Sequence, residues 1–158
     1  YQLAYSNWVK ANYKLSAEYG YRALKYMEHT DHDYEKSLIL LELARTFIDL
    51  NNDEEGRKYL AKVYNLAINH PEDPLILANY YRELSLYYAE TNQSDSAFYA
   101  SDKAIEIYEL RGDTLNKSVL IGRKARILLS QQKFKEAIIL SRQATLLDSL
   151  VNNKRALG

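Results

Sequence analysis

The chain has 158 residues, which fits one ordinary domain, and 47% of them are apolar, which is too many for a disordered chain. It has only five Gly and two Pro, which excludes the tight-turn-rich sandwiches and barrels, and it has no Cys, which excludes disulfides, zinc ribbons and thiol nucleophiles. Its 21 basic residues balance 21 acidic ones, so no bulk charge attracts nucleic acid, and no apolar run reaches the ~20 residues that a membrane span requires. The chain begins at Tyr1 with neither Met nor a leader pattern, so we expect it to be a piece of a longer protein whose compartment stays open.

Small residues recur every 40 or 41 positions and divide the chain into units of about 1–30, 31–70, 71–111 and 112–151. The three columns of the repeat are Ala4, Ala44, Ser85 and Ala125; Ser16, Gly56, Ala97 and Ala137; and Ala23, Val63, Ala104 and Ala144. Larger apolar residues follow in the same register, at helical spacing on two facing stripes in each unit. The sequence therefore predicts a single all-α domain of about eight antiparallel helices in four hairpins, an α–α superhelix.

In chain order, the first unit is expected to hold a helix over residues 1–11, a break at Asn12, and a second helix from about Tyr13 to His29. The second unit pairs a stripe through Leu43 and Ala44 with one through Gly56 and Val63, with polar residues 51–53 interrupting them. The third and fourth units repeat this plan, with breaks at 92–94 and 131–133. The fourth unit's second stripe is Ala137, Ser141, Ala144 and Leu147.

Short side chains at Gly56, Ala97 and Ala137 allow two antiparallel helices to approach closely. Asp73-Pro74 and Gly112-Asp113 are helix start and stop signals that separate one unit from the next. No linker divides the chain between these signals, so one domain is expected.

Leu43-Ala-x-x-Phe47 and Leu84-Ser-x-x-Tyr88 resemble the first helix of a tetratricopeptide repeat, and the small residues that follow resemble its second helix. The resemblance covers the whole chain, although the units are 40–41 residues long against the usual 34 and Lys124 replaces an expected Leu. Long units of this kind are similar to those of bacterial regulators, where they form a sensory or interaction domain. The resemblance implies a solenoid whose concave groove, built from the first helices, binds a protein or peptide segment.

Turning each first helix with its apolar stripe inward leaves one amphipathic face for that groove, with aromatic and Arg side chains of the kind that dominate interfaces. The groove candidates are Tyr1, Tyr5 and Trp8; Arg45, Ile48 and Asp49; Arg82, Leu86, Ala89 and Glu90; and Arg126, Leu129 and Ser130. The family's carboxylate clamp uses Lys and Asn, and the matching places hold Leu41, Arg82, Gly122, Arg45, Leu86 and Arg126. That clamp is therefore not expected, although the Arg residues suit a carboxylate. An ordinary solvated helix face is the alternative reading of all these positions.

Two other sets of side chains have open interpretations. Trp8 is either an aromatic anchor of the groove or a residue that an upstream helix covers. His29 and His32, with Asp31 and Asp33, suit a polar cap better than a metal site, because no third ligand is evident nearby. No catalytic motif and no phosphate loop is present, so neither an enzyme nor a cofactor is expected.

An apolar stripe of Leu146, Leu147, Leu150 and Val151 ends the last helix, where a further helix or a second copy would cover it. The sequence thus favours a non-catalytic peptide-binding scaffold, with a self-association module as the alternative.

Overall fold

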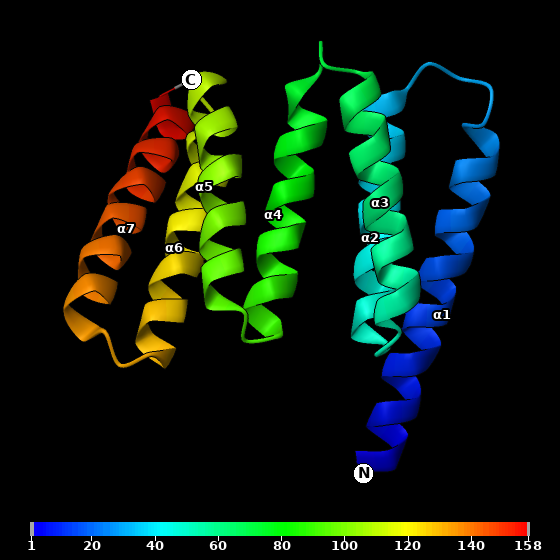
Figure 1. Ribbon diagram of the computed structural model, residues 1–158, viewed down its shortest axis with the longest axis horizontal. Coiled ribbons are helices and arrows are strands. Elements are labelled where there is room, and N and C mark those ends of the chain that lie inside the picture. The colour runs from blue at the N-terminus through cyan, green and yellow to red at the C-terminus, as the bar shows by residue number, and fades with distance from the viewer. Residues whose placement is uncertain (1, 158) are drawn as a thin grey trace. The chain divides into compact units, whose positions relative to one another are not determined.

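The computed structural model describes the backbone of residues 2–157 and the side chains of residues 12–152. Over the described backbone the chain is all-helical, with seven helices and no strand, which confirms the predicted fold class but not the count of about eight (Figure 1). The helices are α1 (Gln2–Tyr26), α2 (Asp33–Asp49), α3 (Asp53–Asn69), α4 (Pro74–Glu90), α5 (Ser94–Leu110), α6 (Thr114–Ser130) and α7 (Phe134–Leu157). Among the described residues, no helix combines the length and the apolar character that crossing a bilayer requires. Neighbouring contacts form two compact units, Tyr1–Tyr80 and Tyr81–Gly158, and α4 runs through the boundary.

Three residues connect the two helices of each hairpin, and one of the three has a left-handed backbone. Asn51, Asn92 and Gln132 have φ between 57° and 60°, at the same place in successive repeats. After α2, the Asn52 amide donates to the Phe47 carbonyl and the Asn51 amide to that of Ile48, both at 2.8 Å, which is the Schellman pattern. The Asn52 side chain then accepts from the Glu55 amide and caps α3. Backbone bonds therefore turn the chain where a polar residue tolerates positive φ.

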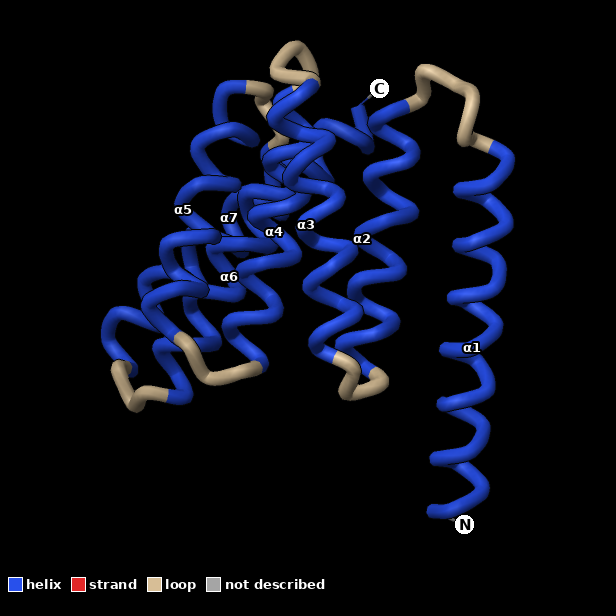
Figure 2. Tube along the Cα trace, turned by 45° about the vertical axis from the view of Figure 1, so that its right-hand side comes forward, coloured by secondary structure: helices blue, strands red, loops and turns tan. Residues whose placement is uncertain are grey.

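The predicted break at Asn12 is wrong, because α1 runs as one helix through this position (Figure 2). The repeat places Ala11 at the left-handed position that Asn51, Asn92 and Gln132 occupy. Ala has no side-chain amide to hydrogen-bond in that conformation, and it is the best helix former. The helix therefore continues where the other units turn, which accounts for the missing eighth helix.

In the first unit, small residues bring the helices together as predicted. A Cβ added to Gly56 would lie 2.6 Å from Ile48 Cγ1 and 3.1 Å from the Ala44 carbonyl oxygen. Ile48 thus packs on α3 and is half-buried, so its expected place in the groove is wrong. Phe47 stacks on buried Tyr59 at 5.6 Å between ring centroids, and burial, followed by a hydrogen bond with Tyr21, raises the pKa of Tyr59.

The second unit follows the same plan. Ala97, Ala104 and Ala137 are fully buried at the helix contacts, and Ser85 Oγ lies 2.7 Å from Ser101 Oγ between α4 and α5. Ser141, which the pattern placed on the buried stripe, is exposed on α7. The repeat pattern predicted a buried residue at this position, and the prediction is wrong for the last helix.

The unexpected Lys124 has a local explanation. Its Nζ lies 2.5 Å from Asp102 Oδ1 and 5.0 Å from the Phe98 ring centroid, both on α5. A charge and a cation–π contact thus replace the apolar contact that Leu would make.

Candidate functional site

A hollow of the second unit lies between the C-terminal half of α4 and the C-terminal half of α6. It encloses about 300 Å³. Its lining residues are Leu86, Ala89, Glu90 and Asn92 from α4 and the turn after it, and Arg123, Arg126, Ile127 and Ser130 from α6. Five of the predicted groove residues therefore meet in one place, namely Leu86, Ala89, Glu90, Arg126 and Ser130.

Helical spacing explains why these side chains converge. The α4 residues are three and four positions apart, and the α6 residues follow the same rule, so each set forms one ridge along its helix. The two ridges border the hollow, and each supplies an apolar side chain, Leu86 or Ile127, beside polar ones such as Arg126 and Ser130. We call this set of eight residues the α4–α6 hollow.

Arg123 lies in the wall of the hollow, and the sequence analysis missed it. Its side chain is buried, at 7% exposure, and its Nη1 donates to the Arg82 carbonyl oxygen at 2.6 Å. The guanidinium thus ties α6 to α4 and fixes a positive charge beside the hollow. The equivalent positions in the earlier units are Glu83 and Glu42, so no repeat signal marks it.

Arg126 is the exposed cation of the hollow. Among the described residues it makes no hydrogen bond and no ion pair, whereas Ser130 Oγ donates to the Ile127 carbonyl at 2.7 Å. Two arginines and one glutamate therefore leave the hollow with one net positive charge.

Arg82 lies beside the hollow rather than in it. Its Nη2 pairs with Glu83 Oε1 at 3.2 Å, and its Nη1 donates to Asn116 Oδ1 on α6 at 3.1 Å. Asn116 is in turn held by Asp113. Arg82 is therefore engaged in linking α4 to α6, while Ala89 lines the hollow and Leu129 is exposed outside the set.

The remaining predicted groove residues belong to the first unit. Arg45 and Asp49 are exposed on α2 and line no described hollow of that unit. Tyr1 lies outside the described residues, and the side chains of Tyr5 and Trp8 lie outside the described side chains, so those predictions stay predictions.

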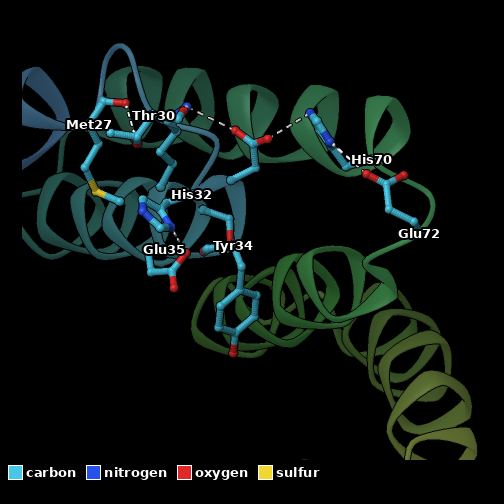
Figure 3. Close-up of polar contacts among 10 residues, drawn as sticks. Met27, Thr30, His32, Tyr34, Glu35, His70 and Glu72 are labelled. Carbon is cyan, nitrogen blue, oxygen red and sulfur yellow. Dashed lines mark hydrogen bonds and ion pairs between the residues drawn. The ribbon is translucent and has the colours of Figure 1, made fainter.

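A cluster of polar side chains lies in the first unit, at the start of α2 and just after α3 (Figure 3). Asp33, at the start of α2, lies 3.1 Å from Lys36 Nζ and 3.2 Å from His70 Nε2, and His70 Nδ1 lies 3.0 Å from Glu72. The Glu72 backbone amide, followed by His70, lowers the pKa of the Glu72 carboxyl. A hollow of about 210 Å³ adjoins these residues. The described residues hold no group of His, Cys, Asp and Glu suited to a metal ion. The contact between Asp33 and His70 joins the chain connection before α2 to the one after α3.

The C-terminal stripe divides into two faces. Leu147 and Val151 are half-buried, whereas Leu146 and Leu150 are exposed on α7, as is Ile139 about two and three turns before them. The exposed half has nothing in the described structure that covers it.

Comparison with protein-family models, with curated proteins and with solved structures gave no match for this chain.

Proposed function

We propose that this chain is a non-catalytic, tetratricopeptide-like scaffold whose α4–α6 hollow binds a segment of a protein partner through one carboxylate. The observation that carries this proposal is Arg126, an exposed guanidinium without an ion pair in the described structure, above a hollow with an apolar side. Arg binds carboxylates through two parallel hydrogen bonds, and Leu86 and Ile127 offer contact to an apolar neighbour of that carboxylate.

The surroundings of the hollow support this choice of ligand. Arg123 adds a second positive charge that is fixed by its bond to the α4 backbone, so it needs little rearrangement when an anion binds. Glu90 at the opposite side disfavours a purely acidic run and favours a segment that carries a single carboxylate.

The resemblance to long tetratricopeptide units suggests a place for this activity. We propose that the scaffold serves as the sensory or interaction module of a larger bacterial regulator. Two features of the sequence support this role, namely the repeat interval and the Leu-Ala-x-x-Phe pattern. Both belong to the repeat itself, so they support the kind of module and do not identify its partner.

The test is an array of immobilised 12-residue peptides in which one Asp, or a free C-terminal carboxylate, is flanked by Leu. Arg126→Gln is expected to weaken the binding of the selected peptides about 10- to 100-fold, because a charge-assisted hydrogen bond contributes about 1.5–3 kcal/mol. Arg142→Gln is the matched control, since Arg142 is an exposed Arg of the same unit outside the hollow. Equal binding by both variants and the parent would contradict the proposal.

A further inference from the structure

One long face of α1 is open in the described structure. Tyr19 and Tyr26 are 59% and 87% exposed, and Leu15 on the same side is exposed too. The opposite side of α1 packs on α2, where a Cβ added to Gly20 would lie 2.8 Å from Leu43 Cδ2. The helix that carries the open face is therefore held in place by α2 on another side.

The repeat register identifies what this face normally holds. The positions equivalent to Tyr19 in α3, α5 and α7 are Tyr59, Ala100 and Leu140, and those equivalent to Tyr26 are Leu66, Ile107 and Leu147. All six are buried or half-buried, and Tyr59 stacks on Phe47 of the preceding helix. The open face of α1 is thus the face that a second helix presents to the first helix of its own hairpin.

A first-helix sequence exists in the same chain, but the backbone carries it away from this face. Leu3 and Ala4 occupy the columns of Leu43 and Ala44, so residues 1–11 carry the first-helix pattern. The backbone of 2–11 continues the axis of α1 and runs past the ends of α2 and α3 (Figures 1 and 2). A straight helix cannot fold its first half onto its second half.

We propose that two copies of the chain exchange these segments and form a two-fold dimer through an antiparallel pair of α1 helices. Residues 2–11 of each copy take the place of a first helix on residues 13–26 of the other. The same helix–helix contact that closes the other hairpins then forms between chains, which is the basis of domain swapping.

The register of the complete hairpins fits a two-fold axis. Three close pairs, Ser85 with Ser101, Phe47 with Tyr59, and Ile48 with Gly56, correspond to positions 4 with 20, 7 with 19, and 8 with 16. All three pairs are centred at residue 12 or 13, close to the middle of the 25-residue α1. Each contact therefore occurs twice in the dimer, as an isologous interface requires.

The first experiment is light scattering on the 158-residue chain at micromolar concentration. The expected mass is twice the 18.4 kDa of one chain. Tyr19→Glu is expected to reduce it to that of a single chain while the far-ultraviolet circular dichroism per residue stays helical, because Tyr19 is 59% exposed in the described structure of one copy. The matched control is Tyr99→Glu, since Tyr99 is also 59% exposed but lies on α5, and it is expected to leave the dimer intact.

The second experiment places the contact. The chain has no Cys, so Trp8→Cys with Ser16→Cys introduces its only two thiols, at the positions that correspond to Ile48 and Gly56. Oxidation is expected to join two chains in a non-reducing gel. A disulfide within one chain would show that residues 2–11 fold back as a hairpin, and it would overturn the exchange. A single-chain mass for the parent, or a dimer that persists in Tyr19→Glu, would overturn it as well.

Discussion

The N-terminal helix α1 and the α6–α7 hairpin are built from the same repeat, but the chain runs straight through one and reverses direction in the other. In the hairpin, Gln132 adopts φ 60° and the Lys133 amide donates to the Leu128 carbonyl at 2.9 Å. In α1 the equivalent position is Ala11, within an uninterrupted helix. The two regions share their small-residue columns, so the columns alone do not decide whether a hairpin forms.

The comparison teaches that one backbone conformation separates a hairpin from a long helix. A left-handed residue costs an L-amino acid about 1–2 kcal/mol, and Asn tolerates it better than Ala does because its short polar side chain can hydrogen-bond locally. The cost is offset where the second helix then packs on the first. At Ala11 no local side-chain hydrogen bond would offset the cost of a left-handed backbone, so the helix continues through this residue.

The largest expected effect comes from filling a hairpin contact. Ala97→Leu is expected to lower the free energy of unfolding by about 1–3 kcal/mol, because Ala97 is fully buried between two helices and a larger side chain overpacks the contact. Urea unfolding followed by circular dichroism measures the loss. Ser16→Leu is the matched change on α1, where Ser16 is half-buried, and at a dilution where the chain is monomeric it is expected to change stability by less than about 0.5 kcal/mol. Equal losses would mean that α1 has a hairpin partner within its own chain.

Smaller effects, with opposite signs, are expected when Gly replaces the equivalent residues Gln132 and Ala11. Gln132→Gly is expected to stabilise the chain by about 1 kcal/mol, because Gly adopts positive φ without the penalty. Ala11→Gly is expected to destabilise α1 by about 1 kcal/mol, because Gly inside a helix is unfavourable. Hydrogen exchange of the α1 and α6 amides reports both changes. The same sign at both positions would refute the difference drawn between them.

The smallest effect concerns the connection between α3 and α4, which side chains hold rather than a left-handed residue. The pKa of Glu72 is lowered by its own backbone amide first and by His70 second, while Asp33 and Lys36 complete the cluster. A lowered pKa means that the contribution is present above the ordinary carboxyl pKa of about 4.3 and is lost as the pH falls below it. Glu72→Gln is therefore expected to lie slightly below the parent in stability near pH 6 and to converge with it near pH 3, as thermal melts across this range would show. A gap that widens toward low pH would contradict the sign.

Much of the fold follows from the repeat interval. Gly56, Ala97 and Ala137 are buried where close helix contacts were predicted, and the polar interruptions near 51–53, 92–94 and 131–133 are turns. A column of Ser37, Ala78 and Ser118 escaped notice although all three are buried, because Ser also suits turns and caps. Periodicity therefore identified most of the core and understated the share of small polar residues in it.

The rest of the site was harder to predict because it depends on links that the repeat does not encode. Leu86, Glu90, Arg126 and Ser130 follow from turning each helix about its apolar stripe. Arg123 does not, since its role depends on a carbonyl 41 positions earlier that only the packed helices bring within reach. Ile48 shows the converse error, because a missing side chain at Gly56 draws it inward.

The bond between the Ser85 and Ser101 hydroxyls has a consequence for the alignment of α4 with α5. Both groups are fully buried, so sliding one helix by a turn would separate them and place each against hydrocarbon without its mate. Alanine and glycine contacts alone are smooth and tolerate such a slip. A single pair of hydrogen-bonded hydroxyls thus fixes the register of α5 along α4.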